Sequence, residues 1–220
     1  MVKNDVFAAL GNNPVIPVLV VENVDHAVPM AKALVAGGLT ALEVTLRTAS
    51  ALQVVKRIAN DVPEVIIGVG TVVRAEQFEQ VKKVGAQFVV SPGCTETLAK
   101  AAQDADMPFL PGAVTASEII AAMELGISDL KFFPAGTSGG AAALKSFSSV
   151  FPDVRFCPTG GVKAVNMADY LSLPNVAAVG GSWLVNSELL NSGNWSEITR
   201  LASSAKAQAE GILATPPTHR

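Results

Sequence analysis

The chain has 220 residues, with sixteen lysines and arginines against nineteen aspartates and glutamates, so its formal charge is −3. Charged residues make up 16% and hydrophobic residues 50%, which predicts a large buried core and excludes disorder as the main state. A pI of 5.4 without long basic runs argues against nucleic-acid binding. Since no apolar run approaches the ~18 residues of a spanning helix and residues 1–10 lack a signal-peptide pattern, we expect a cytoplasmic protein without membrane partners.

Eight short runs rich in valine, isoleucine and phenylalanine recur along the chain, with starts 21 to 26 residues apart. Such spacing is typical of strands in a βα repeat. The expected strands are Val15–Val20, Ala41–Leu46, Val65–Val69, Gln87–Ser91, Phe109–Val114, Leu130–Phe133, Val154–Pro158 and Val176–Gly180.

Helical patterns lie between several of these strands, over Val24–Val35, Ala75–Val84, Thr95–Ala105 and Ser117–Leu125. The last two are each expected to open with a capping residue. Glycines of the kind that cap a helix C-terminus precede the next strand at three places, Gly37, Gly85 and Gly126.

Eight βα units without a linker predict an α/β protein, a single-domain (β/α)8 (TIM) barrel over residues 1–220, with a frayed tail at 214–220. A doubly wound sheet is the alternative, but Gly68-Val69-Gly70 is followed by Val73 where a dinucleotide-binding fingerprint has its third glycine. The alanine-rich helices leave apolar surface outside, so we expect a homo-oligomer, with a tightly packed monomer as the alternative.

The second expected strand alternates between apolar and polar side chains. Its polar positions, Glu43, Thr45 and Arg47, share one face because strand side chains alternate. If the apolar face meets the helices, the polar face points into the barrel, and Arg47 lies at the C-terminal end, where barrel active sites are built. A solvated face of an edge strand would give the same pattern.

The sixth expected strand favours the first interpretation. It places Lys131 between Leu130 and Phe132, and no other lysine of the chain falls in a strand core. An amine among apolar side chains is driven toward its neutral form, which can attack a carbonyl and form a Schiff base. A purely structural salt bridge between Lys131 and Glu43 is the alternative, which we rate lower because barrel interiors are normally filled with valine, isoleucine and leucine.

The seventh and eighth strands end in glycine pairs, within Pro158-Thr159-Gly160-Gly161 and Gly180-Gly181-Ser182. The loops after these two strands are the recurrent phosphate site of the barrel fold. Either pair alone is more often a turn, but the two together predict a phosphate site. Thr71 and Pro92, at the ends of the third and fourth strands, can line the same mouth, with a simple turn residue as the alternative for each.

Several other chemistries are excluded by what the sequence lacks. Its histidines are His26 and His219, which cannot form a zinc-binding cluster. Cys94 and Cys157 fit neither a disulfide framework nor a metal spacing, so we expect reduced thiols. No nucleophile elbow or P-loop occurs. Covalent chemistry through Lys131, without metal or cofactor, remains.

Six motifs occur in order on six of the expected strands: LEVTLR, which contains Glu43, then GVGTV, SPG, KFFPA, RFCPTGG and GGSWL. Together they closely resemble the 2-keto-3-deoxy-6-phosphogluconate (KDPG) aldolase family, also called 4-hydroxy-2-oxoglutarate (KHG) aldolases, over nearly the whole chain. The resemblance implies a metal-independent class I aldolase of the Entner–Doudoroff pathway, usually trimeric. Its 2-keto acid and sugar-phosphate substrates would be cleaved to pyruvate and either glyceraldehyde 3-phosphate or glyoxylate.

The resemblance also implies roles for individual residues. Lys131 would be the Schiff-base lysine, Glu43 the general acid/base, and Arg47 with Thr71 would hold the keto-acid carboxylate. The other implied positions are the pocket-lining Pro92 and Thr159 and the phosphate-binding Gly160, Gly161, Gly181 and Ser182. Gly136 stands where some relatives have an acidic residue, which leaves the preferred acceptor aldehyde open.

Two other functions fit the same residues. A sugar-phosphate isomerase or epimerase would use Glu43 as base and the same phosphate loops, with Lys131 as a purely electrostatic group. A non-catalytic barrel would bind a sugar phosphate without turnover, which leaves the Glu43 and Lys131 pair hard to explain.

Overall fold

The structure is a computed structural model that describes residues 6–11 and 13–214. The first five residues and most of the tail expected at 214–220, His219 included, lie outside these ranges. Among the described residues, no helix is both long and apolar enough to cross a membrane.

Within the described residues, eight strands follow one another along the chain, and each overlaps one of the predicted runs. They are β1 (Val15–Leu19), β2 (Ala41–Thr45), β3 (Ile66–Gly70), β4 (Phe88–Val90), β5 (Phe109–Leu110), β6 (Asp129–Phe132), β7 (Arg155–Pro158) and β8 (Val179–Gly181). The strand β5 ends earlier than expected because Pro111 follows it and has no N–H to donate to a ladder.

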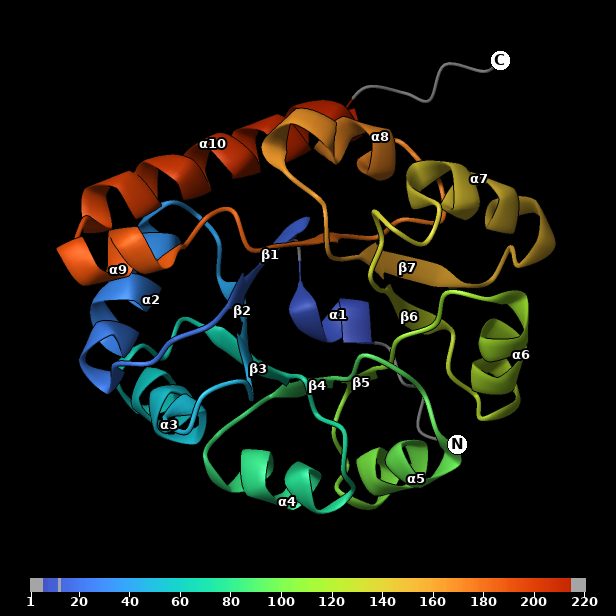
Figure 1. Cartoon of the computed structure of the whole chain (residues 1–220), viewed down its shortest axis with the longest axis horizontal. Helices are drawn as coiled ribbons and strands as arrows, with labels where there is room; N and C mark the ends of the chain where they lie inside the picture. Colours follow the sequence, from blue (N-terminus) through green and yellow to red (C-terminus); the bar gives the residue numbers. More distant parts are fainter. Residues whose placement is uncertain (1–5, 12, 215–220) are drawn as a thin grey trace.

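Helices connect successive strands and lie outside them, as Figure 1 shows. They are α1 (Val6–Leu10), α2 (Ala27–Ala36), α3 (Ala51–Asp61), α4 (Glu76–Lys83), α5 (Glu96–Asp104), α6 (Ala116–Glu124), α7 (Gly140–Val150), α8 (Met167–Leu171), α9 (Ser187–Ser192) and α10 (Trp195–Ala214), with 3₁₀ turns η1 (Val24–His26) and η2 (Ala164–Asn166). The exception is α1, which Figure 1 shows at the centre, surrounded by the strands.

All strand pairs are parallel. Six strands form a curved sheet in the order β5-β4-β3-β2-β1-β8, and β6 pairs with β7 in a second sheet. Isolated parallel bridges connect the two sheets on both sides. Gly112, shortly after β5, pairs with Lys131 of β6, and Thr159, directly after β7, pairs with Gly180 of β8. The protein is therefore an α/β fold with a parallel, strongly curled sheet.

The two faces of each strand have different partners, as the alternation in β2 predicted. Leu42 and Val44 join the large core cluster beneath the helices. Ala41, on the other face, packs in a second cluster with Val6 and Leu10 of α1. All five residues of β2 are buried, so this is not an edge strand with a solvated face.

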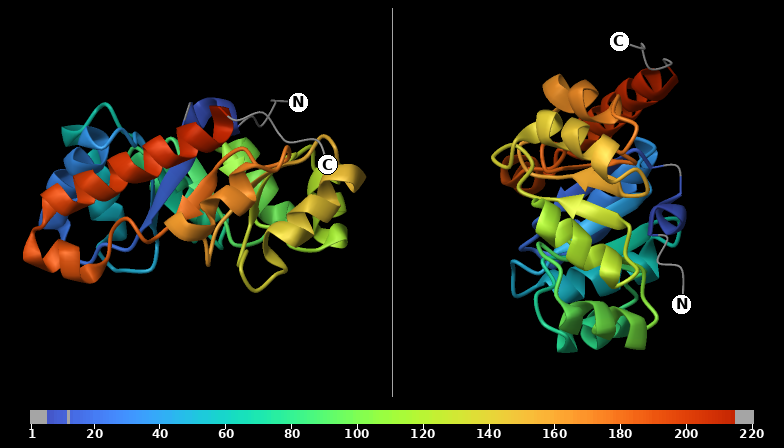
Figure 2. Two further views of the ribbon diagram at one scale, coloured as in Figure 1. Left: turned by 90° about the horizontal axis from the view of Figure 1, so that it is seen from above. Right: turned by 90° about the vertical axis from the view of Figure 1, so that its right-hand side faces the viewer.

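Helix α1 covers the inner face at the N-terminal ends of the strands, which Figure 2 shows from two sides. The buried carboxylate of Asp129, the first residue of β6, helps to hold it there. Asp129 accepts a hydrogen bond from the Phe7 backbone N–H and two from the Arg155 guanidinium, at 2.8 and 2.9 Å. The guanidinium also lies 5.1 Å from the centre of the Phe7 ring. The bidentate ion pair thus links β6, β7 and α1.

Two predicted helix ends differ in detail. The cap of α6 is Thr115, not Ser117, because Thr115 forms a reciprocal capping box with Glu118. At the end of α2, Gly37 has a φ of −79°, and the left-handed position is taken by Gly38, whose φ is +86°. A Cβ atom on Gly37 would lie 2.4 Å from the Ala202 Cβ, so this glycine serves the close packing of α2 on α10.

The Asp129 ion pair leads to a stability prediction. Replacing Arg155 with methionine leaves a buried carboxylate without its bidentate partner, and we expect the free energy of unfolding to fall by about 3 kcal/mol. Chemical denaturation measures this change. The control is Arg57→Met, which breaks the exposed pair with Asp61 and should change stability by less than about 1 kcal/mol. Equal losses in both variants would contradict the prediction.

Candidate active site

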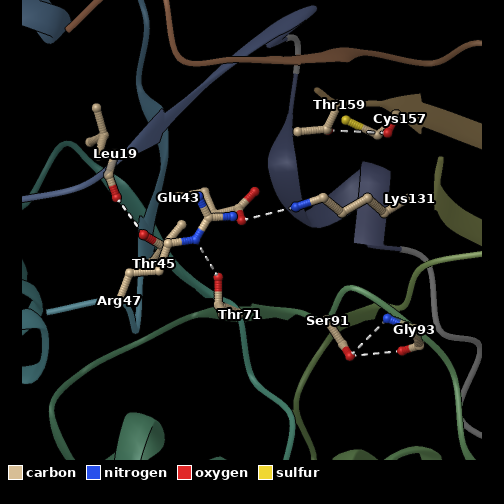
Figure 3. Close-up of polar contacts among 10 residues, drawn as sticks. All are labelled: Leu19, Glu43, Thr45, Arg47, Thr71, Ser91, Gly93, Lys131, Cys157 and Thr159. Carbon is tan, nitrogen blue, oxygen red and sulfur yellow. Dashed lines mark hydrogen bonds and ion pairs between the residues drawn. The ribbon is translucent and has the colours of Figure 1, made fainter. Parts of the chain in front are cut away.

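A buried amine and a buried carboxylate meet on the inner face of the curved sheet. Lys131 of β6 and Glu43 of β2 extend toward each other, and their Nζ and Oε1 atoms lie 3.2 Å apart (Figure 3). The two side chains are only 5% and 4% exposed. The sequence predicted both inward orientations, and the ion pair considered there as an alternative is present. A contact of this length lets a proton pass directly between amine and carboxylate.

Two further side chains surround the Lys131 amine. The Phe133 ring centre lies 5.1 Å from Nζ, within the range of a cation–π contact. Cys157 is the register partner of Lys131 on β7, and burial raises the pKa of its thiol to about 12. Because that pKa lies far above neutral pH, the thiol stays uncharged. The amine therefore has Glu43 as its charged neighbour and neutral groups on the adjoining strands.

Arg47 and Thr71 form a second polar pair, at the C-terminal ends of β2 and β3. The Arg47 Nε atom donates a hydrogen bond of 3.3 Å to the Thr71 hydroxyl (Figure 3). The Arg47 side chain is exposed, so its guanidinium is accessible to a solute. Arginine binds carboxylates through two parallel hydrogen bonds. The pair thus suits an anionic group at the open end of the site.

Thr71 has a backbone conformation that residues other than glycine rarely adopt. Its φ is +63°, in the left-handed region, and a β-branched residue there is a genuine outlier. Such strain costs on the order of 1–3 kcal/mol and persists only where surrounding structure enforces it. Here it occurs at the residue whose hydroxyl meets Arg47, so strain and a site residue coincide.

The two glycine-rich loops lie where the sequence predicted them. Gly160 and Gly161 have φ angles of +88° and +83°, which favours glycine at both positions. The Gly136 N–H donates to the Gly160 carbonyl at 2.8 Å, so the loop after β6 runs beside the loop after β7. A Cβ on Gly160 would lie 3.2 Å from the Phe133 ring. The Phe133 ring therefore lies close to both Gly160 and the Lys131 amine.

The remaining predicted residues lie on neighbouring strand ends. Thr159 is buried, and its bridge to Gly180 places the ends of β7 and β8 together. Gly181 is buried and Ser182 is exposed. The carbonyl of Pro92 would lie 2.1 Å from a Cβ on Gly112, which in turn bridges to Lys131. No hydrogen bond within the described chain joins Pro92 or Ser182 to the Glu43 and Lys131 pair.

Sequence reasoning missed two neighbours of the amine. Phe133 lies two residues after Lys131. Because strand side chains alternate, the sequence could have predicted that both face the same side. Cys157 becomes a neighbour only through the register of β6 with β7, which a single sequence does not encode. Both cysteines are free, as predicted, and no cluster of His, Cys, Asp or Glu among residues 6–11 and 13–214 is suited to a metal ion.

The fold and site together define a class of protein. The parallel strands of an α/β fold place a buried lysine beside a carboxylate. An exposed arginine and glycine-rich loops lie at the C-terminal strand ends. These are the groups that imine chemistry on an anionic carbonyl compound requires.

Comparison with known proteins narrows this class. A family model described as "KDPG and KHG aldolase" matches residues 6–201. The KHG/KDPG aldolase of Escherichia coli K12 is 49% identical over 203 residues, covering 92% of this chain and 95% of its own. The chain therefore belongs to the KDPG and KHG aldolase family.

Two solved structures agree with this assignment. KDPG aldolase from Legionella pneumophila, with pyruvate captured at low pH as a covalent carbinolamine, superposes with a TM-score of 0.88 at 45% identity, covering 90% of this chain and 97% of that one. The Zymomonas mobilis enzyme, bound to 3-phosphoglycerate, gives 0.87 at 44% identity, with coverages of 93% and 96%.

The strain at Thr71 can be tested by thermal unfolding. Thr71→Gly removes the side-chain clash with a positive φ, and we expect it to be about 1 kcal/mol more stable than Thr71→Ala. For a chain of this size, that difference corresponds to about 2–4 °C in Tm. Both variants lose the hydroxyl that accepts from Arg47, so this loss does not affect the comparison between them. Equal Tm values would show that Thr71 is not strained.

Proposed function

We propose that this chain is a class I aldolase in which Lys131 forms a Schiff base with the C2 ketone of 2-dehydro-3-deoxy-6-phosphogluconate. The observation that carries this proposal is the buried 3.2 Å contact between the Lys131 amine and the Glu43 carboxylate. The dual name of the E. coli relative supports 4-hydroxy-2-oxoglutarate as a second substrate.

The covalent step begins when the Lys131 nitrogen, with its lone pair free, attacks the C2 carbonyl carbon. The carbonyl oxygen takes up a proton and gives a carbinolamine, the species captured with pyruvate in the Legionella enzyme. Loss of water then forms a cationic imine. Glu43 lies within hydrogen-bond distance of Nζ and supplies the acid and base that these proton transfers need.

Cleavage uses the same carboxylate. Glu43, directly or through a water, takes the proton of the C4 hydroxyl, the C3–C4 bond breaks, and its electron pair flows into the imine to give an enamine. Glyceraldehyde 3-phosphate leaves. Protonation of the enamine at C3 and hydrolysis of the imine then release pyruvate and restore the Lys131 amine. A positioned acid/base of this kind contributes about 10²–10⁴-fold to a rate.

Substrate binding is assigned to the open end of the site. Arg47 and Thr71 would hold the keto-acid carboxylate, and their 3.3 Å hydrogen bond keeps the guanidinium beside the mouth. Pro92 and Thr159 would line the pocket. The phosphate would lie against the backbone of the two glycine loops, at Gly160, Gly161, Gly181 and Ser182, where glycine permits close approach.

We infer that the eight strands act as one (β/α)8 barrel and form a single domain. The bridges at Gly112 and Thr159 support closure of the two sheets into one ring. We also infer a cytoplasmic homotrimer. An interface would bury the exposed apolar side chains of α6, where Ile120 and Met123 are 49% and 42% exposed.

Reduction with borohydride in the presence of pyruvate tests the Schiff base. We expect peptide mass mapping to find a pyruvyl adduct on Lys131. In Lys131→Met, which keeps the volume of the side chain, the adduct should vanish and cleavage should fall by at least about 10⁴-fold.

Lys145→Ala, which removes an exposed lysine of α7, is the control and should retain both adduct and turnover. Absence of an adduct on the folded wild-type protein would refute the aldolase mechanism and favour an isomerase that uses Glu43 as base.

The phosphate site can be tested through Ser182. Because only the phosphorylated substrate would contact its hydroxyl, Ser182→Ala is expected to raise KM for 2-dehydro-3-deoxy-6-phosphogluconate by about 5- to 20-fold. Steady-state kinetics should show less than a twofold change with 4-hydroxy-2-oxoglutarate. Equal effects on the two substrates would contradict the assignment.

A further inference from the structure

Gly70, the last residue of β3, lies directly beneath the Glu43 side chain. A Cβ atom built on Gly70 would lie 1.9 Å from the Glu43 Oε1 atom, 2.6 Å from Cδ and 2.8 Å from Cγ. The carboxylate and the end of the Glu43 side chain thus occupy the volume that any side chain at position 70 would fill. Oε1 is the same atom that lies 3.2 Å from the Lys131 amine.

The backbone itself does not require glycine at this position. The φ of Gly70 lies outside the left-handed region, and the residue is an ordinary member of β3, paired with Thr45 of β2. An alanine could therefore adopt the same conformation without strain. A side chain at position 70 would instead take the space that the end of the Glu43 side chain occupies, so Glu43 would have to move.

A second glycine on the same face of β3 shows the contrast. A Cβ on Gly68 would lie 2.2 to 2.4 Å from three atoms of the Phe88 ring, a fully buried core side chain. Gly68 thus makes room for packing at the end of the site nearest α1. Gly70 makes room for the carboxylate assigned to acid/base chemistry, two residues nearer the open end.

We propose that Gly70 is a positioning residue, whose lack of a side chain fixes the Glu43 carboxylate within reach of the Lys131 amine and of the bound substrate. This inference rests on the proposed aldolase function. A methyl group and an oxygen in ordinary contact lie about 3.5 Å apart. An alanine at position 70 would therefore displace the carboxylate by roughly 1 Å or more, and misplacement on this scale can cost about 10² in rate.

The Gly70→Ala variant tests the proposal. We expect kcat for cleavage to fall by about 10²-fold. The KM should change less than kcat, since the groups assigned to substrate binding are retained. Gly211→Ala, at a glycine of α10 whose built Cβ would point into open space, is the control and should retain the wild-type kcat. A Gly70→Ala kcat within threefold of wild type would overturn the proposal.

A double-variant cycle distinguishes displacement of Glu43 from general damage. Aspartate is one methylene shorter, so Glu43→Asp removes the two closest contacts with a Cβ at position 70 and leaves only the contact at the Cγ position. If Gly70→Ala acts by displacing Glu43, it should slow the Glu43→Asp enzyme by a clearly smaller factor than it slows the wild-type enzyme. Multiplication of the two losses would show that position 70 acts independently of Glu43 and would refute the inference.

Folding failure would also be informative. If Gly70→Ala does not fold, its combination with Glu43→Ala and Lys131→Met should restore folding, because the obstructing carboxylate and the buried charge that it neutralises are then both gone. If Glu43→Ala with Lys131→Met folds and the triple variant does not, the fold itself needs glycine at position 70 and the inference is overturned. Failure of the proposed function is separate, because it would appear as absence of the pyruvate adduct in the wild-type protein.

Discussion

Two opposite charges held together inside the protein set the main constraint on this structure. Moving an ion out of water costs several kcal/mol, and only a well-placed partner compensates. Lys131 and Glu43 come from strands β6 and β2, which belong to different sheets, so their 3.2 Å contact depends on the placement of the two sheets relative to each other. The curvature of the sheet and the position of the reactive groups are therefore coupled.

Along the strands, the inner face of the sheet changes from apolar to charged side chains. At the N-terminal strand ends, α1 and inward-facing apolar residues such as Ala41 and Phe88 form a dry cluster. The charged pair lies next along the strands, followed by the exposed Arg47 and the glycine loops. The exposed polar group thus lies toward the C-terminal strand ends, while the apolar end supplies packing between the strands and α1. The Asp129 and Arg155 pair ties α1 into this arrangement.

Much of this architecture follows from local sequence. The alternation in β2 predicted Glu43 and Thr45 on the inner face, and the isolated lysine of β6 predicted the buried amine that lies beside Glu43. Contacts that depend on pairing between strands could not be predicted from a single sequence. Cys157 becomes a neighbour of Lys131 only through the register of β6 with β7. Gly70 was recognised only as part of the GVGTV motif, and its contact with Glu43 depends on the pairing of β2 with β3. Helix α1 was missed because five residues show no helical period. The burial of Asp129 was missed because the expected strand began at Leu130.

The sequence left two interpretations of Lys131 open, a nucleophile or half of a structural salt bridge. The structure contains the salt bridge, yet stability alone does not account for it. A hydrophobic pair of similar volume would be at least as stable in most interiors, because neither side chain would lose hydration. The pair instead keeps an amine and a proton acceptor in contact, in a place where Phe133 and the neutral Cys157 thiol add no competing charge. Under the proposed function, this ion pair is the resting state of the site, and transfer of one proton from Lys131 to Glu43 frees the nitrogen lone pair for attack.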